Sequence, residues 1–325
     1  LDGTDVSTTF TYSNIVGSEV ISQTGPGSVS SANVGSGKSV TLGTISLADG
    51  SGVASNYSLT SATLDITQRP ISLSGTRVYD ATSTASSSDL TTLTNLVGSE
   101  TLVLSNSGTV SNANVGTDKT VTIGSLSLGD GSNGGLSSNY TLSGGTHTLS
   151  VTKRPVTISG SRVYDGTAIV SNSSIDTFNN RAGSETLSLT GSGSTGSAAV
   201  GTGKAITLGT LALADNSGLA SNYSLSSGTF DVTVKNVTLV GRRAYDGTTS
   251  VNSSNISSTF TGLAGSETLT LSGSGSVASK NVAAGQSVTI GSIVIANGTG
   301  VASNYSLTSA TLDVTRRPVS LSGTR

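Results

Sequence analysis

Short runs of alternating apolar and polar residues, separated by turn residues, recur along the chain. Val121 and Ile123 alternate with polar residues, and after Gly124 the alternation resumes in the opposite phase at Leu126 and Leu128. A period of two is typical of strands with one buried face. Because a one-residue slip turns the other face inward, each such glycine predicts a tight two-residue turn or a β-bulge, and we favour the bulge. The equivalent glycines are Gly43, Gly209 and Gly291.

Four markers recur in the same order and divide the chain into repeats. Ser-Asn-Tyr-Ser/Thr returns every 82 or 83 residues, accompanied by Gly-Ser-Glu, Arg-Pro-Val/Ile and Arg-x-Tyr-Asp-Gly/Ala-Thr. The third marker is degenerate at Lys235-Asn236-Val237. The predicted bounds are 1–68 for repeat 1, 69–153 for repeat 2, 154–234 for repeat 3, 235–316 for repeat 4, and 317–325 for the first strand of a further repeat. Repeat 1 lacks this first strand, so we expect an excerpt from a longer array.

One segment of each repeat has a different spacing of apolar residues. Leu90, Leu93 and Val97 lie three and four apart, and residues 175–182 and 256–263 repeat the pattern. Polar residues that favour helix N-termini come before each segment, so we predict one short helix or a pair of turns per repeat.

The composition favours strands over long helices. Ser, Thr, Gly and Asn dominate the polar positions, and they favour turns and strands over helix interiors. The hydrophobic residues, 34% of the chain, suffice for small cores once the 42 glycines are added. We predict a mainly β fold of tandem small β-sandwich or β-grasp-like repeats, each with at most one short helix. The prolines at the repeat boundaries favour extended backbone, so these repeats should form an elongated rod.

Charge and cysteine content exclude several classes of partner and chemistry. Sixteen basic and 18 acidic residues leave a net charge of −2, which provides no basic surface for nucleic acid or anionic membrane. The chain also has no cysteine and no run of 18 apolar residues. We expect no nucleic-acid partner, no membrane insertion and no thiolate chemistry.

Several ordered motifs together resemble one known family. Tyr245–Thr249 reads Tyr-Asp-Gly-Thr-Thr, Asn114–Lys119 reads Asn-Val-Gly-x-x-Lys, and Ser221–Leu225 reads Ser-Asn-Tyr-Ser-Leu. With the strand Val121–Leu128, they resemble the YDG-type repeat, which is related to the MBG family of large bacterial adhesins and biofilm matrix proteins. The resemblance covers essentially the whole chain and implies spacer modules. It departs from the motif at Ala81, which stands where the motif has glycine.

The recurring tyrosines and aspartates are interpreted as structural markers. In Tyr-Asp-Gly/Ala, we expect the ring to fill the core while the carboxylate accepts N–H bonds in a turn. Ala81 suggests that the residue after the aspartate is not left-handed. The markers are Tyr79, Asp80, Tyr164, Asp165, Tyr245 and Asp246, and, from Ser-Asn-Tyr, Tyr57, Tyr140, Tyr223 and Tyr305.

Other recurring charges suggest structural roles and a weak metal hypothesis. We expect two sets of recurring charges to be partly buried and hydrogen-bonded: Glu19, Glu100, Glu185 and Glu267, and Arg77, Arg162, Arg243 and Arg325. Asp49, Asp130 and Asp215 are weak calcium candidates because hard cations need clustered oxygen ligands, but Asn297 replaces the fourth member. Turn aspartates are the preferred interpretation.

The remaining candidates for chemistry have no recurring partners. His147 is the only histidine and is expected to lie exposed or at a sheet edge. Lys38, Lys119 and Lys204 could form isopeptide bonds, but Gln286 replaces the fourth lysine. The asparagine of each Asn-Tyr-Ser/Thr sequon is interpreted as a turn residue, with glycan attachment as the alternative.

These observations lead to a functional expectation. We expect no enzyme, no catalytic residue, no cofactor and no metal, but stalk repeats of a bacterial surface or secreted adhesin or biofilm matrix protein. The alternatives are a multivalent glycan- or ice-binding module and a self-assembling extracellular filament subunit. The expected partners are neighbouring repeats, a second molecule joined by strand addition, and glycans through other domains.

Overall fold

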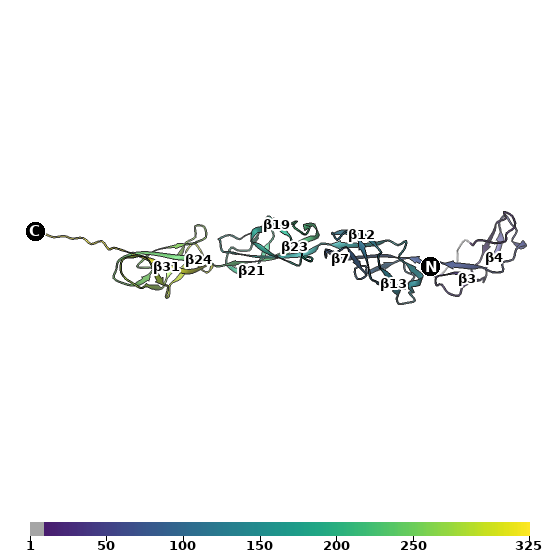
Figure 1. The fold of residues 1–325 in the computed structure, drawn as a ribbon, viewed down its shortest axis with the longest axis horizontal. Helices are drawn as coiled ribbons and strands as arrows, with labels where there is room; N and C mark the ends of the chain where they lie inside the picture. Colours follow the sequence, from purple (N-terminus) through teal and green to yellow (C-terminus); the bar gives the residue numbers. More distant parts are fainter. Residues whose placement is uncertain (1–9) are drawn as a thin grey trace. The chain divides into compact units, whose positions relative to one another are not determined.

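The computed structural model describes residues 10–325, which are almost entirely strands and turns (Figure 1). The chain divides into two compact units, Leu1–Lys153 and Arg154–Arg325. The first unit holds repeats 1 and 2, and the second holds repeats 3 and 4. The predicted mainly β class with tandem repeats is therefore confirmed.

Repeat 2 is built on one six-stranded sheet, whose strand order is β8-β11-β12-β15-β7-β9. Strands β10 and β13 of the same repeat form a separate two-stranded ribbon, and β14 forms a short parallel pair with β6. The strands are β6 (Arg69–Pro70), β7 (Ser72–Val78), β8 (Thr84–Ser86), β9 (Thr92–Thr94), β10 (Leu102–Ser105), β11 (Ser107–Val110), β12 (Gly116–Thr122), β13 (Ser127–Asp130), β14 (Tyr140–Thr141) and β15 (His147–Thr152).

The two ends of the repeat meet at the centre of its sheet. The first long strand, β7, pairs in parallel with the last strand, β15, from Leu73 opposite His147 to Val78 opposite Thr152. The other pairs of the sheet are antiparallel. Alternate residues of these two strands face the core, so Leu73, Leu149 and Val151 are buried.

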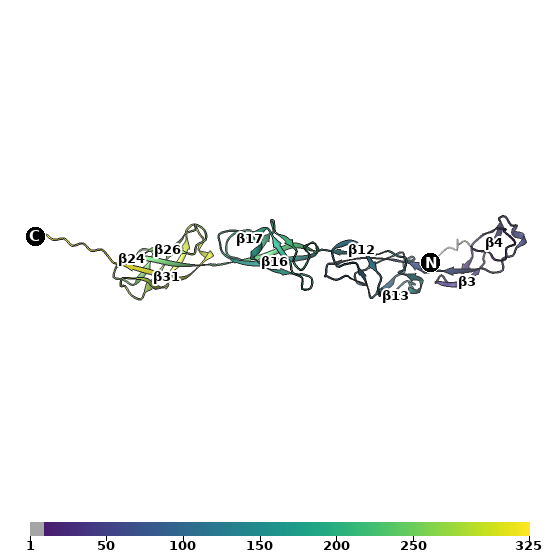
Figure 2. The ribbon, with the colours of Figure 1, turned by 45° about the horizontal axis from the view of Figure 1, so that its top comes forward.

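Repeats 3 and 4 have the same sheet order. Figure 2 labels β16 and β17 of the first sheet and β24, β26 and β31 of the second. Their parallel pairs are longer: β16 pairs with β23 from Arg154 opposite Tyr223 to Val163 opposite Thr233. The sheet of repeat 3 comprises β16 (Arg154–Val163), β17 (Ile169–Ser171), β18 (Ile175–Asn179), β20 (Ser192–Thr195), β21 (Gly201–Thr207) and β23 (Tyr223–Thr233), with the ribbon β19 (Ser188–Thr190) and β22 (Ala212–Ala214). That of repeat 4 comprises β24 (Lys235–Ala244), β25 (Ser250–Asn252), β26 (Ser257–Thr261), β28 (Ser274–Val277), β29 (Ala283–Thr289) and β31 (Tyr305–Thr315), with the ribbon β27 (Leu269–Ser272) and β30 (Val294–Asn297).

Repeat 1 has a smaller sheet. Its described residues form the three-stranded sheet β2-β3-β5 and the ribbon β1-β4, and within them no strand pairs in parallel with β5. The strands are β1 (Ile21–Thr24), β2 (Ser28–Val29), β3 (Gly35–Thr41), β4 (Ser46–Asp49) and β5 (Thr63–Ile66).

The favoured bulge at the phase-shift glycines is wrong, because these glycines form tight turns. The amide of Leu126 donates to the carbonyl of Ile123 at 3.0 Å, and Gly124 has a φ of 57°. The turn carries the chain from β12 in the large sheet to β13 in the ribbon, so the two strands pair with different partners. Side chains change face because the chain changes sheet.

A helix over the apolar residues of 175–182 is also wrong. Residues 175–179 form β18, antiparallel to β16, and the pairing shifts between Ser159 and Gly160. Ile175 and Phe178 pack against the same core cluster, so a bulged strand produced the spacing of three. The described helices are three-residue 3₁₀ turns: η1 (Ala54–Asn56), η2 (Ser137–Asn139), η3 (Asn172–Ser174), η4 (Ala220–Asn222) and η5 (Ala302–Asn304).

Candidate functional site

Within the second unit, repeats 3 and 4 meet at a buried cluster of two tyrosines and one glutamate. Tyr164 follows β16, Tyr305 begins β31, and Glu267 lies just before β27. The Glu267 carboxylate accepts a hydrogen bond from each phenol, at 2.7 Å from Tyr164 and 2.5 Å from Tyr305. Because Tyr164 belongs to repeat 3 and the other two residues to repeat 4, this Tyr-Glu-Tyr clamp joins adjacent repeats.

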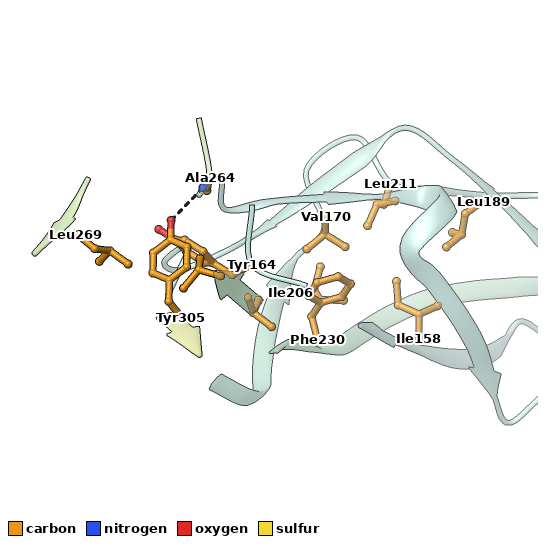
Figure 3. Packing of buried hydrophobic residues seen from close by; sticks show 12 residues of the cluster. Ile158, Tyr164, Val170, Leu189, Ile206, Leu211, Phe230, Ala264, Leu269 and Tyr305 are labelled. Atoms are coloured by element: carbon orange, nitrogen blue, oxygen red, sulfur yellow. Dashed lines mark hydrogen bonds between the residues drawn. The ribbon is translucent and has the colours of Figure 1, made fainter. Parts of the chain in front are cut away.

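The clamp is reinforced by ring packing and a backbone bond. The rings of Tyr164 and Tyr305 stand edge to face with centroids 5.4 Å apart, at an interplanar angle of 82°. The Ala264 amide donates to the Tyr305 hydroxyl at 3.1 Å (Figure 3). Figure 3 also places Leu269 beside the two rings, and the whole group belongs to the apolar cluster that fills repeat 3. The junction is therefore a continuation of the core.

The tyrosine–glutamate pair recurs inside each repeat. Tyr57 donates to Glu19 at 2.7 Å, and the corresponding phenols of repeats 2 and 3 donate to their glutamates, Tyr140 to Glu100 and Tyr223 to Glu185. Glu100, Glu185 and Glu267 are half-buried, as predicted. Glu19 is hydrogen-bonded but exposed, because the described residues of repeat 1 form a smaller sheet around it.

A buried asparagine makes a second contact between repeats. Asn304 is 3% exposed, and its Oδ1 accepts the amide of Val200 in repeat 3 at 3.0 Å. In the first unit Asn139 accepts the amide of Val34 in repeat 1 at 2.9 Å and donates to Asn33 at 3.0 Å. Glycan attachment at these two asparagines is wrong, since both side chains are buried in contact with the neighbouring repeat. The sequon marks these asparagines in the sequence, but it does not indicate that they contact the neighbouring repeat.

The Tyr-Asp-Gly/Ala marker forms a turn that is held by hydrogen bonds to the aspartate side chain. Asp80 Oδ1 accepts the amide and the hydroxyl of Thr82, both at 2.9 Å, while Tyr79 is buried. The equivalent bonds occur at Asp165 and Asp246. The ring fills the core at Tyr79 and Tyr164, as expected, whereas Tyr245 is half-buried. The amide of Thr248 is the main cause that holds the pKa of Asp246 below its usual value. The Asp246 carboxylate thus holds its turn as an anion.

The arginine of the same marker closes the turn from its other side. The Arg77 guanidinium donates to the carbonyls of Thr82 and Thr84 and lies 3.3 Å from Asp80. Arg162 and Arg243 make the same pattern of contacts. The predicted burial and hydrogen bonding are confirmed for these three arginines, whereas Arg325 is exposed and the prediction is wrong there.

The expectation for Ala81 is wrong, because this residue is left-handed. Its φ is 66°, close to the 83° of Gly166 and the 81° of Gly247. The Asp80 bonds and the Arg77 contacts fix the turn strongly enough to hold an alanine there. A left-handed backbone costs a residue with a β-carbon about 1–2 kcal/mol.

Replacing Ala81 with glycine is therefore expected to stabilise repeat 2. Part of the relieved strain is offset by the greater freedom of glycine in the unfolded chain, so the net gain is about 0.5–1 kcal/mol. Thermal unfolding followed by circular dichroism measures it. Gly247→Ala is the reverse control and should destabilise, since a β-carbon there meets nothing within 4 Å and acts through the backbone alone.

The weak calcium candidates hold loops. Asp49 accepts the amide of Ala54 at 2.7 Å, and Asp215 accepts that of Ala220 at 2.7 Å. Asp130 accepts both the amide and the hydroxyl of Ser137, which lower its pKa. Asn297 makes the same bond to Ala302 at 2.8 Å, which explains why an amide can replace the carboxylate. Residues 10–325 contain no group of three or more histidines and carboxylates that could hold a metal ion.

His147 is buried, so the expected exposed or edge position is wrong. It starts β15 beside β7, and its Nε2 lies 2.8 Å from the carbonyl oxygen of Leu142. A β-carbon at Gly145 would lie 1.8 Å from the carbonyl oxygen of Ile71 and 3.1 Å from the imidazole, so the glycine lets the chain pass close to both. The histidine fills a packing site of repeat 2.

The recurring lysines also bind backbone oxygen. Lys119 Nζ donates to the carbonyls of Asn112 and Asn114 at 2.6 and 2.7 Å, and Lys204 makes the equivalent pair of bonds. Gln286 reaches the carbonyl of Asn281 at 3.0 Å. These side chains therefore hold the loop before the long strand, a role that an amide also performs.

Alkaline pH should open the clamp. Burial first, and then the bond to Glu267, raise the pKa of Tyr305 from 10.0 to about 12. Because the folded chain favours the protonated phenol, this stabilisation is complete below pH 10 and disappears as the pH rises through about 12. Hydrogen exchange at Ala264, combined with tyrosinate absorbance, should show loosening in that window. Tyr305→Phe should reduce the step and leave the part due to Tyr164, whose pKa is also raised by burial and by the bond to Glu267. A step of unchanged size would contradict the assignment.

Comparisons with known proteins agree with the repeat architecture. No helix of residues 10–325 has the length and apolar character needed to cross a membrane. No curated protein matches the chain. The model of the YDG domain matches three consecutive segments, residues 65–149, 148–230 and 231–312. These segments cover most of the sequence and confirm the resemblance drawn from its motifs, so the chain belongs to the YDG domain family.

Proposed function

We propose that these repeats form a structural stalk or spacer in a bacterial surface or secreted adhesin or biofilm matrix protein. The observation that carries the proposal is the Tyr-Glu-Tyr clamp of Tyr164, Glu267 and Tyr305, which joins repeats 3 and 4 through side chains of both. A stalk must transmit force from one module to the next. Buried hydrogen bonds and ring packing between adjacent repeats suit that task better than a flexible linker.

The same reasoning supports a non-enzymatic role. The Tyr-Asp pairs are the recurring motif that could most readily be interpreted as an acid/base pair, but their carboxylates stabilise turns. Each accepts two hydrogen bonds from the threonine two residues later in the sequence: Asp80, Asp165 and Asp246. The proposed location outside the cell follows from the stalk role.

Single-molecule stretching of the full chain tests the proposal. A stalk should unfold in discrete steps of one repeat each, and repeats 3 and 4 should resist force better than a Glu267→Ala variant does. Small-angle scattering of the same sample tests the extended arrangement, which stays a prediction. Unfolding without resistance, or a compact scattering profile, would contradict a stalk.

A further inference from the structure

Repeat 2 has a longer loop than the other repeats after the last strand of its ribbon. At the start of this loop, the Asp130 carboxylate accepts the amide of Ser137, seven residues later. The equivalent bonds of the other three repeats span five residues and start at Asp49, Asp215 and Asn297. Two residues are therefore inserted in repeat 2, at a loop tip that reads Ser132-Asn133-Gly134-Gly135.

Asn133 and Gly134 form a tight turn at this tip. The Gly135 amide donates to the carbonyl of Ser132 at 3.1 Å, and φ is 57° at Asn133 and 89° at Gly134. Asn-Gly is the pair that favours a turn with two left-handed central residues. Both residues are exposed, and within residues 10–325 the Gly134 amide donates no hydrogen bond. The nitrogen of Gly134 is therefore available to react.

One side-chain contact holds the loop tip against the rest of repeat 2. Asn133 Nδ2 donates to the carbonyl of Ser99 at 3.0 Å. The tip also lies near the carboxylate of Glu100, since a β-carbon at Gly134 would be 4.0 Å from its Oε1. Glu100 accepts the phenol of Tyr140. The position of Asn133 therefore suits a side chain that donates a hydrogen bond and carries no charge.

We propose that Asn133 is a site of spontaneous deamidation, and that the product releases the loop tip from Ser99. The Gly134 nitrogen attacks the side-chain Cγ of Asn133, and glycine has no β-carbon to hinder the approach. A bond forms between Cγ and this nitrogen, the bond from Cγ to Nδ2 breaks, and Nδ2 leaves as ammonia with the proton of the Gly134 amide. Water then adds to either carbonyl of the cyclic imide and opens it to aspartate or isoaspartate.

The product does not match its surroundings. A carboxylate has no hydrogen to donate, so two acceptor oxygens meet where Nδ2 bound the Ser99 carbonyl. The new negative charge also lies near that of Glu100, and like charges repel at short range. The contact that held the loop tip becomes repulsive, and the tip detaches from the repeat.

The chain contains a second Asn-Gly pair, Asn297 and Gly298, which the fold protects. Asn297 Oδ1 accepts the amide of Ala302 at 2.8 Å, and the Gly298 amide donates to the carbonyl of Gly300 at 3.2 Å. Both groups that would react are held in other bonds, and Asn297 is fixed at the end of β30. The two pairs have the same chemistry in different settings.

Peptide mapping of the full chain during storage at mildly alkaline pH tests the proposal. Trypsin separates the two pairs, because cleavage after lysine and arginine places Asn133 in residues 120–153 and Asn297 in residues 281–316. Mass spectrometry should show conversion of amide to acid about fivefold or more faster at Asn133, since Asn297 must also break the bond at its attacking nitrogen. Equal rates, or a faster reaction at Asn297, would overturn the proposal.

The chain unfolded in urea is the control for the effect of the fold. Both pairs are Asn-Gly, so they should react at similar rates once the loop bonds are lost. A preference for Asn133 that persists unchanged in urea would show that neighbouring residues cause it, and the structural assignment would be wrong.

Ala302→Pro tests the protection of the second pair. Proline lacks the amide that Asn297 accepts, and Ala302 is the first residue of η5, a position that tolerates proline. Val301 before it is extended, as proline requires. Deamidation at Asn297 should become about 2- to 10-fold faster. An unchanged rate would contradict the assigned protection.

Asn133→Asp tests the consequence of the reaction. Hydrogen exchange should become faster at the amides of Ser132, which donates to Thr101 Oγ1 at 2.7 Å, and Gly135. Asn133→Gly is the matched control: it suits the left-handed backbone, removes the donor without adding charge, and abolishes the reaction in residues 120–153. Its effect on exchange should be smaller. Exchange of the Asp variant at the wild-type rate would overturn the proposed release of the loop.

Discussion

Replacing Glu267 with alanine is expected to destabilise the junction between repeats 3 and 4 by about 2–4 kcal/mol. The change leaves the hydroxyls of Tyr164 and Tyr305 without their shared acceptor, and hydrogen bonds to charged groups contribute about 1.5–3 kcal/mol each. The apolar cluster remains, so repeat 3 should still fold. The loss should appear as faster hydrogen exchange at Ala264, whose amide donates to the Tyr305 hydroxyl.

The chain offers a matched control for this variant. Glu19 accepts one phenol, that of Tyr57, at an exposed site, so Glu19→Ala removes the same chemical group with little effect on stability. The joint use of Glu267 by two repeats is tested separately by Tyr164→Phe combined with Glu267→Gln. A coupling energy of about 1 kcal/mol or more is expected, and strictly additive effects would show that the clamp does not link the repeats.

Local alternation predicted most of the strands. Val121 and Ile123 alternate with polar residues because they lie near the end of β12, which buries one face. The repeat markers recur often enough to align all four repeats. The tyrosines of Ser-Asn-Tyr are interpreted from their recurrence as structural markers. Tyr140, Tyr223 and Tyr305 are indeed buried.

The sequence-based predictions were wrong where the local conformation depends on contacts with residues far along the chain or within a turn. The phase change at Gly124 reflects a change of sheet, which depends on partners far along the chain. Ala81 adopts a left-handed conformation because Asp80 and Arg77 over-determine its turn. The backbone propensity of alanine depends on its β-carbon alone and takes no account of those contacts.

The contacts between repeats were the least predictable part of the site. Glu267 was expected to be hydrogen-bonded, but nothing in the spacing shows that its partners come from two repeats. Asn304 is a turn residue, as interpreted, since it ends η5, but nothing in the sequon shows that its side chain also accepts the amide of Val200 in the preceding repeat. Pairing within a repeat and pairing between repeats give the same periodic signal, because the tyrosine and glutamate markers recur in both cases.

Phe230→Ala is expected to produce the largest loss of stability, about 3–5 kcal/mol, which is the usual cost of removing a buried phenylalanine ring. Phe230 is fully buried in β23, and Figure 3 shows it among Ile158, Val170 and Ile206. Its ring also lies 5.8 Å from the guanidinium carbon of Arg162, which closes the Tyr-Asp turn. The variant removes packing and loosens that turn together.

A loss of this size should unfold repeat 3 before its neighbour. Small domains are stable by about 5–15 kcal/mol, so one repeat of this size retains little after the change. Urea unfolding followed by circular dichroism should split into two transitions, since stability in repeat proteins is a sum of repeat and interface contributions. Phe178→Ala is the matched control: its ring is half-buried on β18, so the same deletion should cost less and keep the transitions together. If both variants unfolded alike, the core of repeat 3 would not be centred on Phe230.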